Sequence, residues 1–439
     1  MSAAGGDRGA EAVRDQVPGA LPARPSADLP IGRPGGPPHE RAPEGPTEPL
    51  AAVRSRGRPV PWAAIGRALL PAALFLGVRT VGIVVLAIVA TRQGTRLADE
   101  LGSWDGQWFL GLAQGGYDGV PIGLGDAYGH RSGETPLAFF PGYPASVAVV
   151  RFVTGLPLLP AALTATALAG VVAAYGVARL GELVPGGSRR VGLVLVVLFA
   201  STPMAVVFSM AYSEALFCAA AAWALVFLLR GQWVGAGLAA AAAGLVRPTA
   251  AALVAAVGLA ALVAVVARRD GWRPWLGGPL AAAGLLAYLG YVASRTGSLT
   301  GWFALQQRGW DSRFDGGRAT ASFAAAALAD GRSVMEVATV GILLGAVALL
   351  AVSVGQAVRG WMPWPLVAYS AVVLLMDVGS NGLMGSKARL LVPAFTLLLP
   401  PAVGLAKRRP GTRVSVLVAA VLVAAWFGAY ALVDWPYAI

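Results

Sequence analysis

An aspartate between two tryptophans is the first feature of this sequence that could do chemistry. Asp105 lies between Trp104 and Trp108, in a polar stretch that follows the first long apolar segment of the chain. A carboxylate can act as a general base, and partial loss of its water shell beside an indole ring raises its basicity. The flat apolar faces of the indole rings, together with the carboxylate, could also bind a sugar or a polar lipid headgroup. The pattern therefore predicts a site that takes a proton from a hydroxyl group.

The same residues also have a purely structural interpretation. Asp105 would cap a short helix that runs through Leu112, because Asp is a preferred residue at helix N-termini. The two tryptophans would then belong to the aromatic belt where a membrane meets water. Capping and catalysis do not exclude each other, so both interpretations stay open on the sequence alone.

Composition indicates a helical membrane protein. Hydrophobic residues make up 56% of the 439 residues and charged residues only 13%, whereas soluble proteins carry about 25% charged residues. Apolar runs of about 20 residues recur, and each can cross ~30 Å of hydrocarbon. Residues 1–60 are rich in Pro, Gly, Ala and Arg without apolar periodicity, which predicts a disordered cytoplasmic tail. Residues 61–439 are expected to form one transmembrane domain.

The apolar segments predict an all-α polytopic bundle of about eleven transmembrane helices with two long outer loops. The expected spans are 69–90, 158–183, 191–209, 215–229, 234–245, 249–267, 276–293, 334–354, 361–376, 390–406 and 414–433. The segment 137–152 is ambiguous, because it is apolar but short and contains two prolines near its start. It either crosses the membrane or lies along its surface. The first long loop precedes this segment, and the second covers 294–333.

The distribution of basic residues favours one orientation, since cytoplasmic connections carry an excess of Lys and Arg. If 137–152 does not cross, the inner connections carry Arg189, Arg190, Arg230, Arg268, Arg269, Arg359, Lys407, Arg408 and Arg409. Both acidic long loops then fall on the outer side together. The expected protein is thus a multi-pass cell-membrane protein with a cytoplasmic N-terminus and an outer active site. Topology also accounts for the net charge of +12, so no nucleic-acid partner is expected.

Metal and disulfide chemistry is limited by composition. The sequence has one cysteine, Cys218, and two histidines, His39 and His130. An intrachain disulfide is therefore excluded, and a zinc site built from His and Cys is not expected. We predict no metal ligands and no certain cofactor, although carboxylates could bind a divalent cation.

Three segments of the first loop occur in a combination that is similar to a known family. They read Trp104-Asp105-Gly106-x-Trp108-Phe109, Ala113-x-x-Gly116-Tyr117 and Phe139-Phe140-Pro141-x-Tyr143-Pro144. Together they resemble the PIG-V family, which comprises GPI mannosyltransferase II and its bacterial relatives in the GT-C class of membrane glycosyltransferases. Many relatives carry Tyr at the position of Phe109, so a hydroxyl contact there would be missing.

The resemblance implies a GT-C-like bundle that transfers a sugar, typically mannose, from a polyprenyl-phosphate donor on the non-cytoplasmic face. It implies that Asp105, in the first outer loop, is the catalytic acidic residue. Asp99 and Glu100 are weaker rivals because they lie upstream of the motif. Attack by an acceptor hydroxyl in a single displacement would invert the anomeric centre.

A departing phosphate needs cations, and arginine matches its geometry with two parallel hydrogen bonds. The outer-side candidates for donor-phosphate binding are Arg389, Arg247, Arg308 and Lys387. Each could instead be an interfacial side chain whose charged end reaches water. We expect the substrate-binding residues to be Trp104, Gln107, Trp108, Tyr143 and Glu214. Arg79, inside the first span, is expected to face the bundle in a structural role.

The expected activity is therefore that of a membrane hexosyltransferase, and more finely of a mannosyltransferase. Its partners would be a polyprenyl-phosphate sugar donor, surrounding membrane lipids, and a glycolipid, glycan or protein acceptor of the cell envelope. Two other functions stay open. A transporter or flippase of a polar lipid would show internal repeats and broken helices with polar residues near mid-membrane. A non-catalytic partner subunit would keep the fold without the activity.

Overall fold

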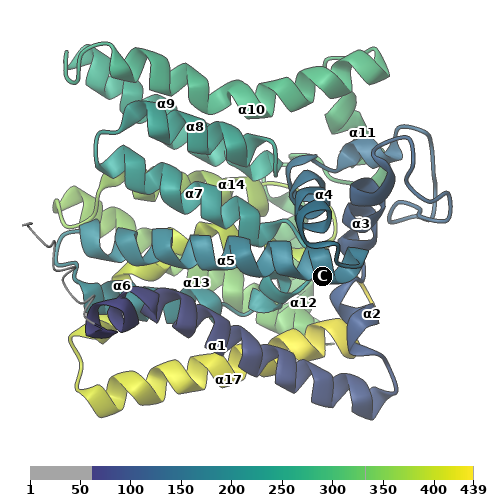
Figure 1. Cartoon of the computed structure of the whole chain (residues 1–439), viewed down its shortest axis with the longest axis horizontal. Helices are drawn as coiled ribbons and strands as arrows, with labels where there is room; N and C mark the ends of the chain where they lie inside the picture. Colours follow the sequence, from purple (N-terminus) through teal and green to yellow (C-terminus); the bar gives the residue numbers. More distant parts are fainter. Residues whose placement is uncertain (1–61, 332, 439) are drawn as a thin grey trace, which may run out of the picture. The chain divides into compact units, whose positions relative to one another are not determined.

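The structure is a computed structural model that describes residues 62–331 and 333–438. The expectation for the tail at 1–60 lies outside these residues. Within the described part every regular element is a helix, and the one β-type pairing is an isolated bridge between Phe314 and Ser380. The all-α class is therefore confirmed (Figure 1).

Six helices of the described part are long and apolar enough to cross a membrane, as an integral membrane protein requires. They are α1 (Trp62–Gln93), α5 (Leu158–Leu183), α9 (Ala251–Val266) with the preceding turn η3 (Pro248–Ala250), α10 (Arg273–Thr296), α13 (Val334–Val358) and α17 (Pro410–Val433). A seventh span arises if a pair of helical stretches bent by 51° is counted as one. That pair joins η4 (Met384–Ser386) and α15 (Lys387–Leu390) to η5 (Val392–Leu398) and α16 (Leu399–Ala406).

Four further expected spans form shorter or interrupted helices, so the count of eleven is not confirmed. These are α6 (Arg189–Ala200) with η2 (Ala205–Ser209), α7 (Glu214–Leu229), α8 (Trp233–Gly244) and α14 (Trp364–Val378). The 12 residues of α8 cover about 18 Å at 1.5 Å per residue, well short of the ~30 Å hydrocarbon core. An apolar run measured along the sequence therefore overstates how much of it is one straight helix.

The ambiguous segment 137–152 is too short to cross a membrane alone. It contains the end of η1 (Thr135–Ala138) and most of α4 (Gly142–Thr154). With 13 residues, α4 covers about 20 Å. One face of α4 packs against α3 and α5, while Phe152 near its end is 91% exposed. The structure thus agrees with the alternative in which this segment does not span.

The two long loops pack on each other at one end of the bundle (Figure 1). Their helices are α2 (Leu97–Leu101) and α3 (Asp105–Gly115) in the first loop, and α11 (Gly301–Trp310) and α12 (Arg318–Asp330) in the second. The Ala127 N–H donates to the Gly309 carbonyl at 3.0 Å, and the Trp302 indole donates to the Ala138 carbonyl at 3.2 Å. The loops therefore share one end, as the charge argument requires. That this end faces outward stays a prediction.

Small residues allow neighbouring helices to pack at short range. Helices α8 and α10 lie side by side (Figure 1), and a Cβ placed on Gly284 of α10 would lie 1.8 Å from the Ala241 carbonyl oxygen of α8. Without a hydrophobic driving force between helices in lipid, such close backbone contact is what holds spans together. The many Ala and Gly residues of the sequence thus act as packing surface.

Arg79 of α1 has the structural role expected of it. Its side chain is buried, and it donates to the Ser209 hydroxyl from Nε and to the Ala200 carbonyl from Nη1, both at 3.0 Å. Ala200 is the last residue of α6, where a carbonyl has no partner within the helix. The guanidinium therefore joins the end of α6 to η2 and α1.

Substitution Arg79→Ala should lower the stability of the protein by about 1–3 kcal/mol, because it leaves a buried carbonyl and hydroxyl without their donor. The thermal unfolding midpoint in detergent micelles measures this loss. Arg92→Ala, an exposed arginine at the end of the same helix, is the matched control and should leave the midpoint unchanged. Equal midpoints for the two variants would contradict the assigned role.

Candidate active site

Four charged side chains from distant parts of the sequence form one row beside the loop helix α3. Arg389 Nη1 donates to Asp105 Oδ2 at 2.6 Å, and Arg389 Nε lies 3.7 Å from Glu214 Oε1. Arg247 Nη1 approaches the same Glu214 oxygen to 2.7 Å. The charges alternate along the row, from Asp105 through Arg389 and Glu214 to Arg247, so the formal charges cancel. We call these four residues the charge row.

Burial differs along the charge row. The side chain of Glu214 is fully buried, those of Arg389 and Arg247 are 9% and 12% exposed, and that of Asp105 is 28% exposed. Taking a charge out of water is costly unless an opposite charge compensates it. The row supplies that compensation for its inner members. Asp105 is the member most open to an incoming molecule.

Asp105 is the first residue of α3, and Trp104 occupies the cap position before it. The capping interpretation of Asp105 is therefore wrong, and its carboxylate accepts a hydrogen bond from Arg389 instead. The backbone of Trp104 has φ 53° and ψ −125°, a region that non-glycine residues rarely adopt and that marks functional sites. The Trp104 side chain is 37% exposed.

Tyr212 contacts Asp105 and Arg389, the two members at the exposed end of the charge row. The Asp105 N–H donates to its hydroxyl at 3.2 Å, and the Arg389 guanidinium carbon lies 5.3 Å from its ring centroid, within cation–π range. Its neighbour Ser213 accepts a hydrogen bond from Arg247 at 2.9 Å. Tyr212 is not among the site residues predicted from the sequence. Its signal is a Tyr-Ser-Glu run immediately before an apolar helix.

The proline-rich motif of the first loop positions Arg247. The Gly142 N–H donates to the Leu245 carbonyl at 2.8 Å, and a Cβ on Gly142 would lie 2.8 Å from that same oxygen. Only glycine permits this approach. Two residues later Arg247 has extended backbone angles, which the following Pro248 favours. The Phe-Phe-Pro-Gly-Tyr-Pro segment therefore holds the turn that carries one of the two arginines.

Aromatic packing fixes the rest of that motif. The Tyr288 and Tyr117 hydroxyls both donate to the Phe139 carbonyl, at 2.7 and 2.9 Å, and the Trp108 ring stacks on Phe139 with centroids 5.1 Å apart. Burial raises the pKa of Tyr117, so its hydroxyl stays protonated. Phe109 is buried in edge contact with Phe139, which shows that its ring belongs to the packing here.

Lys387 has a different position from the one predicted. Its ammonium group is buried and donates to the main-chain carbonyls of Asp377 and Ser380, at 2.6 and 2.7 Å. It thus closes the end of α14 and joins it to the turn that carries Arg389. The carboxylate oxygens of Asp377 are buried without a hydrogen-bond partner in the described part of the chain. Sequence reasoning missed Asp377, which looks like an interfacial acid at the end of an apolar run.

The other predicted residues lie outside the charge row. Arg308 is exposed and lies 3.5 Å from Glu134. Tyr143 is fully buried, and its hydroxyl bonds to the Ala162 carbonyl at 3.1 Å and the Thr166 hydroxyl at 2.8 Å. The last two, Trp108 and Gln107, are a buried ring and an exposed amide on α3. Of the predicted set, the structure brings together Asp105, Arg389, Arg247 and Glu214, with Trp104 alongside.

Several polar atoms of the charge row have no hydrogen-bond partner in the described residues. They are Arg247 Nε, Arg389 Nε and both carboxylate oxygens of Glu214. The 2.7 Å contact between Arg247 and Glu214 is therefore an ion pair of poor hydrogen-bond direction. Two unmatched guanidinium donors suit an anion with several oxygens, such as a phosphate. Among the described residues no group of three or more His, Cys, Asp or Glu side chains has metal-binding geometry.

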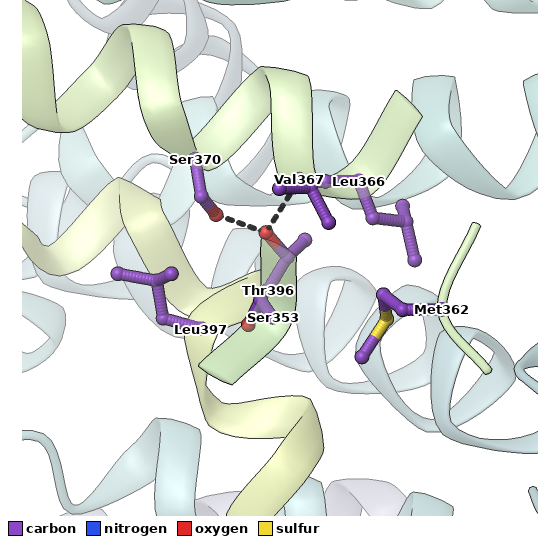
Figure 2. Close-up of a pocket in the computed structure, with 7 residues that line it drawn as sticks. All are labelled: Ser353, Met362, Leu366, Val367, Ser370, Thr396 and Leu397. Atoms are coloured by element: carbon purple, nitrogen blue, oxygen red, sulfur yellow. Dashed lines mark hydrogen bonds between the residues drawn. The ribbon is translucent and has the colours of Figure 1, made fainter. Parts of the chain in front are cut away.

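Two hollows lie away from the charge row. One is a narrow space between α13, α14 and η5, where the Thr396 hydroxyl bonds to Ser370 and to the Leu366 carbonyl (Figure 2). Its polar groups are hydrogen-bonded within the protein, so we interpret this space as a gap in the packing and not as a binding site.

The second hollow is a cleft of about 340 Å³ beside the turn that precedes Arg389. It is mostly apolar, with one carboxylate, and is lined by Phe323, Met335, Glu336, Thr339, Leu383, Met384, Gly385, Trp435, Tyr437 and Ala438.

Comparison with known proteins finds likeness among solved structures and none among family profiles or curated proteins. Among solved structures it is similar to ArnT from Cupriavidus metallidurans, crystallised with undecaprenyl phosphate, with a TM-score of 0.49 and 16% identity. The match covers 81% of this chain but only 63% of ArnT.

At position 104 glycine should be more stable than alanine by about 1–3 kcal/mol, because only glycine adopts these backbone angles without strain. The thermal unfolding midpoints of Trp104→Gly and Trp104→Ala test this. Gln107 of α3 provides the matched pair, where alanine should instead be the more stable by about 0.5–1 kcal/mol. The same order at both positions would show that Trp104 is unstrained.

Proposed function

We propose that this protein is a membrane glycosyltransferase that moves a hexose, mannose by expectation, from a polyprenyl-phosphate donor to a hydroxyl of a cell-envelope acceptor. The observation that carries the proposal is the charge row itself. It sets a partly exposed carboxylate, Asp105, directly beside the buried guanidinium of Arg389, with Arg247 farther along. A base and two cations suited to phosphate therefore occur in one cluster. The segments that resemble the PIG-V family pack around it.

The reaction needs one general base and a set of cations around the departing phosphate. The acceptor oxygen attacks the anomeric carbon and forms the new glycosidic bond, while Asp105 takes the hydroxyl proton. The bond from the anomeric carbon to the phosphate oxygen breaks, and the polyprenyl phosphate leaves with the electron pair. This leaving group needs no proton, so a single carboxylate suffices. Attack opposite the departing phosphate inverts the anomeric centre.

The arginines would stabilise the charge that develops on the phosphate. Fixed donors aimed at developing charge in a site shielded from water are usually the largest catalytic contribution. Arg389 and Arg247 are mostly buried, and the Nε donor of each lacks a hydrogen-bond partner in the described structure. A phosphate that contacted both arginines would take the terminal nitrogens of Arg389 and the unpaired Nε donor of Arg247.

The apolar cleft offers a place for the hydrocarbon part of the donor. It is lined by Met384 and Gly385 on the turn that leads into Arg389. A phosphate held at Arg389 would thus have an apolar surface a few residues away along the chain.

Of the other functions, a transporter is favoured by one observation. The helical stretches that contain Arg389 form a pair bent by 51°, and interrupted helices are a feature of transporters. The charge row, however, includes the first residue of the loop helix α3 and the first residue of α7. Charges gathered at helix ends favour the transferase. A non-catalytic partner subunit differs from it only in activity.

Asp105→Asn should fold normally but lower sugar transfer by about 10²–10⁴-fold, since the amide cannot take the proton. The measurement is transfer of radiolabelled mannose from polyprenyl-phosphate mannose to lipid extract, in membranes that contain equal amounts of each variant. The matched control is Asp118→Asn, an exposed aspartate of the same loop paired with Arg295, which should transfer at the wild-type rate.

Transfer by Asp105→Asn at the wild-type rate would remove Asp105 as the base. If the wild type transfers neither mannose nor any other sugar from a panel of polyprenyl-phosphate donors, the glycosyltransferase proposal fails as a whole.

A further inference from the structure

The base is occupied in the structure. Asp105 Oδ2 accepts a hydrogen bond from Arg389 Nη1 at 2.6 Å, so one oxygen of the proposed base is already paired with a guanidinium. In the proposed reaction the departing phosphate needs the same guanidinium to stabilise its negative charge. For the proposed transfer, on which this inference rests, Asp105 is therefore a better base once Arg389 has moved to other partners.

A second carboxylate is in position to receive Arg389. Arg389 Nε lies 3.7 Å from Glu214 Oε1, and both atoms are buried without a hydrogen-bond partner among the described residues. A buried donor and a buried acceptor that are left unpaired destabilise the folded state. A shift of roughly 0.8 Å would bring the pair to a normal hydrogen-bond length of ~2.9 Å. The site thus contains a hydrogen bond that is nearly formed.

The surroundings of Glu214 stabilise its negative charge, so it can accept the Arg389 guanidinium. It is the first residue of α7, where the helix dipole stabilises a negative charge, and Arg247 Nη1 lies 2.7 Å from it. The other titratable side chains near it are Tyr143, Tyr212 and Cys218, all protonated in their ordinary state. Asp105 faces Arg389 and Tyr212.

We propose that Glu214 is a positioning residue that takes the Arg389 guanidinium from Asp105 when the donor phosphate enters, and so frees Asp105 to act as the base. In this exchange one arginine moves between two carboxylates. Its Nε turns to Glu214, its terminal nitrogens turn to the phosphate, and Asp105 is released. The base would therefore be active only when the donor is bound.

Glu214→Gln tests the exchange with little change of shape. Arg389 should remain on Asp105, so kcat should fall at least tenfold while KM for polyprenyl-phosphate mannose changes less than threefold. The acid limb of kcat against pH should move to lower pH, because a base that keeps its cationic partner is harder to protonate. Glu214→Asp keeps the charge and should restore part of kcat and the wild-type limb.

Ser213→Ala provides the comparison for a merely structural role. It removes the Arg247 contact to the Ser213 hydroxyl but no charge, so it should leave the acid limb in place even if kcat falls. A Glu214→Gln enzyme whose acid limb coincides with that of the wild type would overturn the exchange, whatever its kcat.

A second measurement separates this inference from the proposed function, because it needs no transfer. The probe is a short-chain prenyl methyl phosphodiester, which does not titrate near neutral or mildly acidic pH. Its binding to the detergent-solubilised wild type near pH 5 should be accompanied by proton uptake, as Asp105 loses its guanidinium. Glu214→Gln and Asp105→Asn should bind the probe with little uptake. Binding by the wild type without proton uptake would overturn the exchange even if sugar transfer is found.

Discussion

Mutual neutralisation of two arginines and two carboxylates is the interaction on which the site depends. Glu214 stands between Arg389 and Arg247, and Asp105 completes the charge row on its open side. Removal of one partner from a buried pair strands the other charge at a cost of about 3–5 kcal/mol. The row therefore specifies how four chain segments meet, and it does so at the place where an anionic substrate would be recognised.

Much of the surrounding structure holds those segments in place. The bent pair of helical stretches brings Arg389 to the start of α3, and Lys387 joins the same turn to the end of α14. That end is in turn paired with the second loop through the Phe314–Ser380 bridge. On the other side Gly142 supports the turn before Arg247. Both long loops are thus coupled to an arginine of the charge row through packing and hydrogen bonds.

The sequence allowed the class and the longest helices to be predicted, because a continuous apolar run is a local property. The span expected at 158–183 coincides with α5, which is preceded by Pro157. The run at 234–245 was predicted as a span, but α8 ends after 12 residues. An Ala-rich pattern does not show that such a helix is too short to cross the membrane. Straightness depends on tertiary packing, which apolar periodicity does not record.

The site was predictable in part for a similar reason. Asp105 and its arginines stand out because a charge in an apolar chain requires a partner. The choice of partner is not local, since Arg389 and Asp105 lie 284 residues apart in the sequence. Lys387, two residues before Arg389, is likewise a basic residue next to an apolar run. Its ammonium group, however, donates to main-chain carbonyls at the end of a helix. Orphaned backbone groups are invisible to residue-type reasoning, and that is why the two cations could not be told apart.

The central claim is that the charge row is the phosphate site of a transferase. Its most direct test is a cryo-electron microscopy structure of the protein in lipid nanodiscs with polyprenyl phosphate bound. The account predicts that the phosphate lies within hydrogen-bond distance of Arg389 and Arg247, and that the Arg389 contact to Asp105 is lost. A phosphate bound elsewhere, with the Asp105–Arg389 pair intact, would contradict it.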